Sequence, residues 1–313
     1  MTLGRDDLLA ARRRVAPLIH RTTVLTCEGL DRRAAARLLF KCENFKKTGS
    51  FKMRGASNAL GVLRESDPPT AVATHSSGNF AAALALAARS HGMGAFIVMP
   101  GTASAAKRDA VREYGGEIIE CDPTLEARET TAAEVSAREG APLVHPHNDL
   151  PVIAGQSTAT MELLDEEPDL DAVVAPVGGG GLISGTALAA HYFGRDVKVY
   201  GAEPAGADDA FRSLQAGRIV PSVDPDTIAD GLRTSLGPNT FPVIQQHVET
   251  IILVEDSDTI AAMHAVWMRM KIIIEPSSAV AVAAVLNRPD LFEGRRVGII
   301  LSGGNVDLGR LPF

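Results

Sequence analysis

Residues 45–54, FKKTGSFKMR, contain three lysines, but only Lys52 stands where a helix could begin. Lys52 follows Ser50 and is flanked by Phe51 and Met53. An amine that is desolvated beside an aromatic ring has a lowered pKa, and a neutral amine attacks carbonyl carbons. The alternative is a surface lysine whose stem lies along apolar side chains. Lys52 is therefore a candidate nucleophile, provided that other residues supply a partner for it.

Four consecutive glycines, residues 178–181, follow an apolar run and precede a helical pattern in the segment PVGGGG. Such a turn lets backbone N–H groups converge on an anion at a helix start, which favours a phosphate. A dinucleotide-binding fingerprint is the alternative, because Glu203 ends the next apolar run, where a ribose-binding acid would lie. That fingerprint needs Gly or Ala at position 183, where this chain has Ile183, so the spacing fails.

Two more polar segments follow apolar runs. In SSGNF, the amides around Ser76 and Gly78 could hold a carboxylate, and Asn79 could donate to a phenolate-like oxygen. In LSGGN, Ser302 offers a lone hydroxyl that could face a ring nitrogen. A phosphate cradle, a poised amine and such a hydroxyl are the parts that hold pyridoxal 5′-phosphate as a Schiff base. Each segment alone is equally typical of an ordinary turn or capped helix.

The elements that must position these residues alternate along most of the chain. Apolar runs at 37–42, 70–75, 94–100, 116–121, 141–145, 171–177, 197–203, 250–254 and 295–302 predict strands. Patterns at 79–91, 104–113, 124–138, 151–166 and 256–271 predict helices. Such alternation predicts an α/β fold with parallel sheets flanked by helices, in which ligands bind beyond the carboxyl ends of the strands.

Length and composition predict two lobes. A chain of 313 residues with 45% hydrophobic residues can bury a large core, which is more typical of two lobes than of one. Residues 65–70 and 145–151 look like the two crossings between them. We therefore expect a small inserted domain at 71–148 and a large cofactor-binding domain from 1–70 plus 149–313.

Charge and cysteine usage exclude several classes of protein. A formal net charge of −7 argues against nucleic-acid and acidic-membrane partners. Cys27, Cys42 and Cys121 are odd in number and widely spaced, which fits reduced thiols in a cytoplasm better than disulfides or a zinc site. The charged N-terminus lacks the apolar core of a signal peptide, so we expect a cytoplasmic protein without a membrane span.

Seven segments resemble, in order and spacing, the serine racemase and serine/threonine dehydratase family. They are FKKTGSFKMRGASNAL, HSSGNFAAALALAA, PVGGGGLISG, EPAGADDA, IADGLRTSLG, IEPSSAVAVAA and LSGGNVDL. The resemblance covers nearly the whole chain. It implies a fold-type II pyridoxal-phosphate enzyme, similar to the tryptophan synthase β chain, that forms a homodimer.

The resemblance also implies roles for individual residues. Lys52 would carry the Schiff base, Phe51 would pack beside the cofactor ring, and Asn79 would contact the ring oxygen. The implied cofactor-binding set is Phe51, Lys52, Asn79, Gly178, Gly179, Gly180, Gly181, Leu182 and Ser302. Ser77 would act as acid and base on the face opposite Lys52 in the racemase branch. The implied substrate-binding set is Ser76, Ser77, Gly78 and Arg128.

EPAGADDA resembles the divalent-cation loop of the family. The resemblance implies that Glu203 and Asp209 bind through their carboxylates and Ala207 through its carbonyl. Oxygen ligands alone suit Mg²⁺, Ca²⁺ or Mn²⁺ and do not suit zinc. The alternative is a pair of solvated loop acids.

Two departures from the family pattern concern the substrate. Phe80 stands where the racemase-type loop commonly has His, and HPHND at 145–149 replaces the more usual HPNQ or HPFDD. Arg128 aligns with an arginine that can reach a carboxylate, although an exposed helix charge is the simpler interpretation. The departures leave the identity of the substrate side chain open.

These implications favour a dehydratase, an ammonia-lyase that converts a small β-hydroxy amino acid such as L-serine or L-threonine to an oxo acid and ammonia. The alternatives are a serine racemase, which needs bases on both faces of the substrate, and a 3-hydroxyaspartate dehydratase, in which Arg128 accepts the β-carboxylate. A non-catalytic binding protein is disfavoured, because an inert module has no need of a lysine poised for Schiff-base formation.

Overall fold

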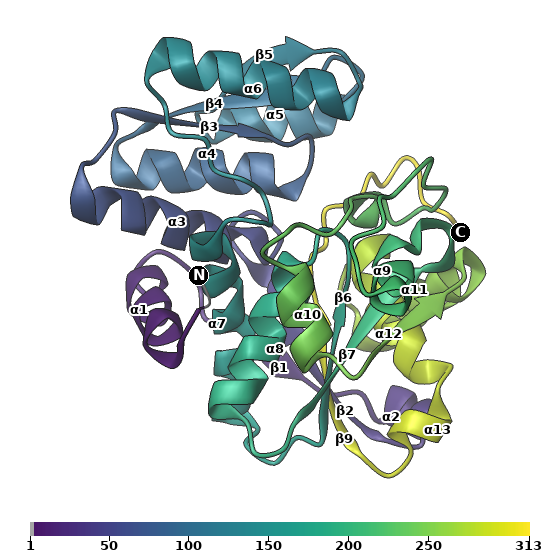
Figure 1. Cartoon of the computed structure of the whole chain (residues 1–313). Coiled ribbons are helices and arrows are strands. Elements are labelled where there is room, and N and C mark those ends of the chain that lie inside the picture. The colour runs from purple at the N-terminus through teal and green to yellow at the C-terminus, as the bar shows by residue number, and fades with distance from the viewer. Residues whose placement is uncertain (1–2) are drawn as a thin grey trace.

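The computed structural model describes residues 3–313 and arranges their strands in two sheets (Figure 1). The larger sheet has the strand order β1-β2-β9-β6-β7-β8 and the smaller the order β3-β4-β5. All neighbouring strands are parallel except β1 and β2. The strands are β1 Val24–Leu25, β2 Arg37–Cys42, β3 Ala71–His75, β4 Gly94–Pro100, β5 Glu117–Cys121, β6 Ala172–Pro176, β7 Lys198–Pro204, β8 Thr250–Val254 and β9 Arg296–Leu301. The predicted α/β class with parallel sheets is confirmed.

Helices cover both sheets and account for most of the connections. The first group is α1 Arg5–Val15, α2 Glu28–Ala34, α3 Lys52–Ser66, α4 Asn79–His91, α5 Ala105–Glu113, α6 Leu125–Glu139 and α7 Leu150–Glu166. The second is α8 Gly181–Phe193, α9 Asp209–Ala216, α10 Phe241–His247, α11 Asp256–Met270, α12 Pro276–Leu286 and α13 Pro289–Phe292. Short 3₁₀ turns are η1 Glu43–Phe45, η2 Ala205–Ala207 and η3 Asp230–Leu232.

The larger sheet is buried on both faces. Leu39 and Val173 belong to a core shared with α7, α8 and α10, whereas Phe40 and Val174 belong to a second core shared with α11 and α12. Successive strand residues point to opposite faces, so an uninterrupted apolar run supplies both cores at once. This explains why the strand segments read as continuous apolar stretches.

The smaller sheet carries α4 and α5 on one face and α6 on the other (Figure 1). Its strands and these helices all lie within 71–148, but the core beneath α4 also takes in Met53 and Leu60 of α3 and Val152 of α7. Helices α3 and α7 thus pack between the two sheets. The domain boundaries themselves stay a prediction.

The predicted helices at 79–91 and 256–271 agree with α4 and α11 to within a residue. The predicted strand at 141–145 is wrong. Only Leu143 forms an isolated bridge, to Ala73 of β3. Pro142 has no N–H to donate, and the His145 amide donates to the Asp149 carboxylate rather than to a ladder, so the pairing ends at once.

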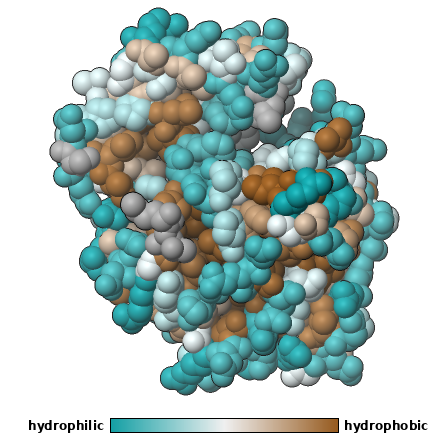
Figure 2. Space-filling model, viewed as in Figure 1, coloured by the Kyte–Doolittle hydropathy of each residue, from teal (hydrophilic) through white to brown (hydrophobic). Residues whose placement is uncertain are grey.

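Among residues 3–313, no helix combines the length and the apolar character needed to cross a membrane. Figure 2 shows hydrophilic side chains over most of the face in view, with apolar side chains in smaller patches. This surface is ordinary for a protein surrounded by water.

Candidate functional site

Lys52 lies where the end of the larger sheet meets the start of α3. The strand β9 ends at Leu301, and the Phe51 amide donates to the Ser302 carbonyl oxygen at 2.9 Å. An antiparallel bridge joins Ser50 to Gly303 beside this bond. Backbone pairing between segments about 250 residues apart therefore brings Lys52 and Ser302 together, as the cofactor prediction requires.

The Lys52 amine is buried among apolar rings. Its Nζ lies 5.0 Å from the ring centre of Phe51 and 5.8 Å from that of Phe80, and it donates to the Pro146 carbonyl oxygen at 3.1 Å. Burial lowers the pKa of Lys52 to about 8, and the charge of Glu275 opposes this shift. A substantial fraction of the amine is neutral near pH 8, which suits attack on a carbonyl carbon.

The glycine turn joins β6 to α8 and admits no side chains. Gly180 has φ +86°, in the left-handed region that favours glycine. A Cβ on Gly179 would lie 2.3 Å from the Cδ2 atom of His147, and one on Gly181 would lie 2.8 Å from the His147 carbonyl oxygen. Thr240 Oγ1 lies 3.0 Å from the Gly179 carbonyl oxygen and donates to it. The turn is thus held between His147 and Thr240.

The amides of this turn form a ready anion site. The first helical bond of α8 runs from the Ser184 amide to the Gly180 carbonyl oxygen. Within the residues that the structure describes, the amides of Gly179, Gly180, Gly181 and Leu182 have no acceptor. Unpaired N–H groups at a helix start attract anions, phosphate above all.

The loop between β3 and α4 carries the predicted carboxylate-binding residues. The Ser76 amide donates to the Val98 carbonyl oxygen at 3.0 Å, which ties the loop to β4. The Gly78 amide approaches Ser76 Oγ at 3.4 Å. The Ser77 hydroxyl makes no hydrogen bond within residues 3–313, so it is free to bind a ligand.

Glu275 and Asn305 are site residues that the sequence reasoning missed. Asn79 Nδ2 donates to the Glu275 carboxylate at 2.8 and 3.2 Å, and Asn305 Nδ2 donates to Asn79 Oδ1 at 2.8 Å. Burial raises the pKa of Glu275 to about 7, against the effect of the Asn79 bond. Both residues stand in segments that carried the family resemblance, and a lone acid in an apolar run was the available signal.

A histidine cluster was also missed. The ring centres of His75 and His145 are 5.2 Å apart, and those of His145 and His147 are 4.5 Å apart. His145 Nδ1 accepts from the Asn148 amide at 3.1 Å. Burial lowers the pKa of all three, to about 4 for His145, so the imidazoles are neutral at pH 7. The unusual HPHND segment was the signal, but His75 lies far from it in sequence.

Arg128 does not reach the atoms around Lys52. Its Nε donates to the Thr124 carbonyl oxygen, 3.3 Å away, at the start of its own helix α6. Its charge still contributes to lowering the pKa of His75, after burial, so the guanidinium lies within electrostatic range of the β3 end.

The two predicted metal-binding acids are buried near one another. Glu203 ends β7 without exposed surface, and its carboxylate accepts from the Ala210 and Phe211 amides at 2.9 and 2.8 Å. Asp209 is 1% exposed and neither of its carboxylate oxygens has a hydrogen-bond partner. Burial raises the pKa of Glu203 to about 8 and that of Asp209 to about 6. In the described chain no three His, Cys, Asp or Glu side chains could hold a metal together, so an ion here would need backbone oxygens and water.

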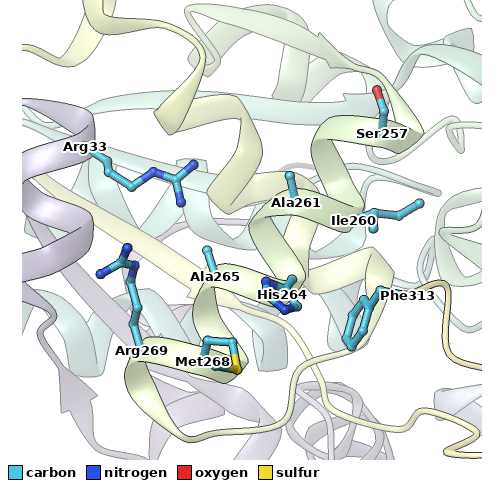
Figure 3. Close-up of a pocket in the computed structure, with 9 residues that line it drawn as sticks. All are labelled: Arg33, Ser257, Ile260, Ala261, His264, Ala265, Met268, Arg269 and Phe313. Atoms are coloured by element: carbon cyan, nitrogen blue, oxygen red, sulfur yellow. The ribbon is translucent and has the colours of Figure 1, made fainter.

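A separate cavity of about 670 Å³ lies against α2, α11 and the C-terminal residue (Figure 3). Arg33 enters it from α2 and Arg269 from α11, beside His264 and Phe313. None of its lining residues belongs to the glycine turn or to the loops around Lys52, so the cavity is not part of the candidate site.

Comparisons with known proteins agree with this geometry. The family model described as pyridoxal-phosphate dependent enzyme matches residues 15–303. A beta-hydroxyaspartate dehydratase of Paracoccus denitrificans (strain Pd 1222) is 47% identical over 98% of both chains. The structure of maize serine racemase has a TM-score of 0.95 at 42% identity and covers 99% of this chain and 95% of its own. A threonine deaminase from T.th. has a TM-score of 0.93 at 41% identity, covering 98% and 99%.

These matches confirm the resemblance predicted from the motifs, the fold class and the cofactor. They extend over nearly the whole of each chain, so no large part of the relatives lacks a counterpart here. The chain therefore belongs to the pyridoxal-phosphate dependent enzymes.

Proposed function

We propose that the protein is an ammonia-lyase that removes water from a small β-hydroxy amino acid, such as L-serine or L-threonine, and releases an oxo acid and ammonia. The observation that carries the proposal is the buried Lys52 amine held on Pro146, next to His147, which packs on the glycine turn. The likeness to a dehydratase, a racemase and a threonine deaminase supports the same class of substrate.

The residues present fit pyridoxal phosphate. The unpaired amides from Gly179 to Leu182 suit its phosphate, and the neutral fraction of Lys52 suits its aldehyde. Ser302 is 2% exposed, and its hydroxyl makes no hydrogen bond within the described chain, so it can serve the ring nitrogen. We assign the phosphate to the turn at 178–182, the ring oxygen to Asn79 and the ring face to Phe51.

When bound, the cofactor supplies an aldehyde for the substrate amine and an electron sink for the α-carbon. Lys52 takes the α-proton, because it is the basic group beside the aldehyde site. The loop at Ser76, Ser77 and Gly78 holds the substrate carboxylate through its amides and hydroxyls. Phe51 and Phe80 keep water away from the amine, which maintains its lowered pKa.

The test is the Lys52→Ala variant together with a substrate screen. We expect oxo-acid release from L-serine or L-threonine by the wild-type protein and no turnover by the variant. We also expect the variant to lose the absorbance band at about 410–420 nm, where a Schiff-base cofactor absorbs. Turnover by Lys52→Ala at a rate near wild type would contradict the assignment.

A racemase is the second candidate, and the unengaged Ser77 hydroxyl favours it. A racemase needs a proton donor on the face opposite Lys52, and Ser77 is the residue of this loop that we assign to that face. Incubation of L-serine in D₂O separates the two reactions by chiral chromatography. We expect pyruvate to accumulate faster than deuterated D-serine, and the reverse ratio would make racemisation the main activity.

A 3-hydroxyaspartate dehydratase is supported by the 47% identical relative and by Arg128. We propose that the Arg128 guanidinium serves the β-carboxylate if such a substrate binds. Arg128→Gln should then raise KM for 3-hydroxyaspartate and leave KM for L-serine unchanged. An equal change for both substrates would remove Arg128 from the substrate site.

We propose a divalent cation, Mg²⁺, Ca²⁺ or Mn²⁺, bound by the carboxylates of Glu203 and Asp209 and the Ala207 carbonyl. Two buried acids close together, one with no hydrogen-bond partner, support an oxygen-ligand site. An ion bound only to the folded state raises the melting temperature. Chelation should lower it in the wild type and leave Glu203→Gln unaffected; a melting temperature that chelation does not change would contradict the site.

We further propose a homodimer in the cytoplasm. The dimer rests on the family resemblance, and the location rests on three cysteines that all remain free thiols in the structure. Light scattering after size-exclusion chromatography should give about twice the 33.0 kDa of one chain.

A further inference from the structure

Glu275 is a buried acid that capping of its own helix does not explain. It occupies the N-cap position of α12, yet its side chain makes no capping hydrogen bond to that helix. The residue is 5% exposed, and burying a carboxyl group is costly unless hydrogen bonds compensate it. The carboxylate packs against Gly303, where a Cβ would lie 2.5 Å from Oε1. It accepts its hydrogen bonds from Asn79 Nδ2, at 2.8 and 3.2 Å.

Asn305 holds the other end of the same amide. Its Nδ2 donates to Asn79 Oδ1 and to the Thr48 carbonyl oxygen, both at 2.8 Å. The oxygen and nitrogen of an asparagine amide have nearly the same shape, so the neighbours decide which way it points. Here an acceptor faces the nitrogen and a donor faces the oxygen.

The opposite orientation is strongly disfavoured. If the Asn79 amide turned over, its oxygen would face the oxygens of Glu275 and its nitrogen would face Nδ2 of Asn305. Both hydrogen bonds would be lost, and like partial charges would meet in a buried place. An amide nitrogen carries two hydrogens, so one remains for a ligand after the bond to Glu275.

We propose that Glu275 is a positioning residue that fixes Asn79 as a hydrogen-bond donor toward the cofactor. The inference rests on the proposed function, which assigns Asn79 to the cofactor ring oxygen. Glu275 fulfils this role whether charged or protonated, since either form keeps an oxygen that accepts from Nδ2. The role therefore differs from that of an acid or base in the reaction.

Glu275 also influences Lys52, and the test must separate the two effects. The charge of Glu275 raises the pKa of Lys52, so removing that charge changes the amine as well. Asp230 and Lys107 are the other charged groups whose fields reach Glu275, and they form an ion pair with each other. Asp230→Asn removes a nearby negative charge without touching Asn79, which makes it the matched control.

The experiment is titration of the full-length apoenzyme with pyridoxal phosphate, followed by fluorescence and by the visible absorbance band. Glu275→Gln keeps an acceptor oxygen for Asn79, so we expect its cofactor Kd to rise by no more than about threefold. Glu275→Leu removes the acceptor, so we expect a rise of at least about tenfold and a shifted band. Asp230→Asn should bind like the wild type. Equal losses for Gln and Leu would overturn the proposal.

A double-mutant cycle decides whether Glu275 acts through Asn79. In an Asn79→Ala background, Glu275→Leu should change the cofactor Kd no further. An undiminished effect there would overturn this inference alone. Normal cofactor binding by Asn79→Ala itself would overturn the assignment of Asn79 in the proposed function, and the inference with it. If Glu275→Leu does not fold, Asn305→Ala makes the same test from the other end of the amide, with the same expected outcomes.

Discussion

Arg54, two residues after Lys52 on α3, joins two buried acids. Its guanidinium donates to both carboxylate oxygens of Glu43, at 2.6 and 2.8 Å, and to both of Glu162, at 2.9 and 2.6 Å. The side chains of Arg54 and Glu43 have no exposed surface. Burial alone would raise the pKa of Glu43, but the charges of Arg54 and Lys46 outweigh it and lower that pKa to about 2.

We predict that Arg54→Met destabilises the protein by about 3–5 kcal/mol at pH 7, because it strands two carboxylates in the interior. The depressed pKa of Glu43, 4.5 to about 2, corresponds to roughly 3 kcal/mol and so agrees with this range. The control is Arg14→Met. Arg14 also grips a carboxylate with two bonds of 2.7 Å, but its partner Glu65 is 58% exposed. That change should cost at most about 1 kcal/mol.

Urea unfolding followed by circular dichroism measures both losses, and a pH series supplies a second signature. A carboxyl whose pKa is lowered by folding stabilises the protein above its unfolded pKa, and this stability is lost as pH falls toward the folded value. The difference between wild type and Arg54→Met should therefore narrow from pH 7 to about pH 3. If Arg54→Met and Arg14→Met cost the same, or if the difference does not depend on pH, the reasoning from buried charge is refuted.

Three further predictions concern the site itself. Gly179→Ala should weaken cofactor binding at least about tenfold, because its Cβ would lie 2.3 Å from the His147 ring, whereas Gly4→Ala meets only an atom 3.7 Å away and should bind normally. Thr240→Val should lower the free energy of unfolding by about 1–2 kcal/mol in urea, since it strands the Gly237 amide and the Gly179 carbonyl; a loss near zero would contradict this. The rate at which apoenzyme combines with pyridoxal phosphate should rise with pH and level off above about 8, as Lys52 loses its proton; a midpoint above about 10 would contradict the lowered pKa.

Local patterns in the sequence were enough for the elements and the central motifs. The helix at 79–91 was predicted closely because its apolar residues and the terminal Gly92, which takes up a left-handed φ of +71°, are signals within one segment. The glycine turn and Lys52 were found for the same reason. The strand predicted at 141–145 failed because its length depended on a partner, and only Leu143 pairs with β3.

What the sequence alone determined is therefore the fold class, the family and the residues whose chemistry is written in one contiguous motif. The tertiary structure decided which distant side chains meet them: Glu275 on Asn79, 196 positions away, His147 on the glycine turn, and the buried Arg54 cluster. Helix periodicity and turn chemistry act over a few residues, so they can be read from the chain directly. Contacts at the carboxyl ends of parallel strands arise only when the sheet order brings those ends together, and that order depends on packing across the whole molecule.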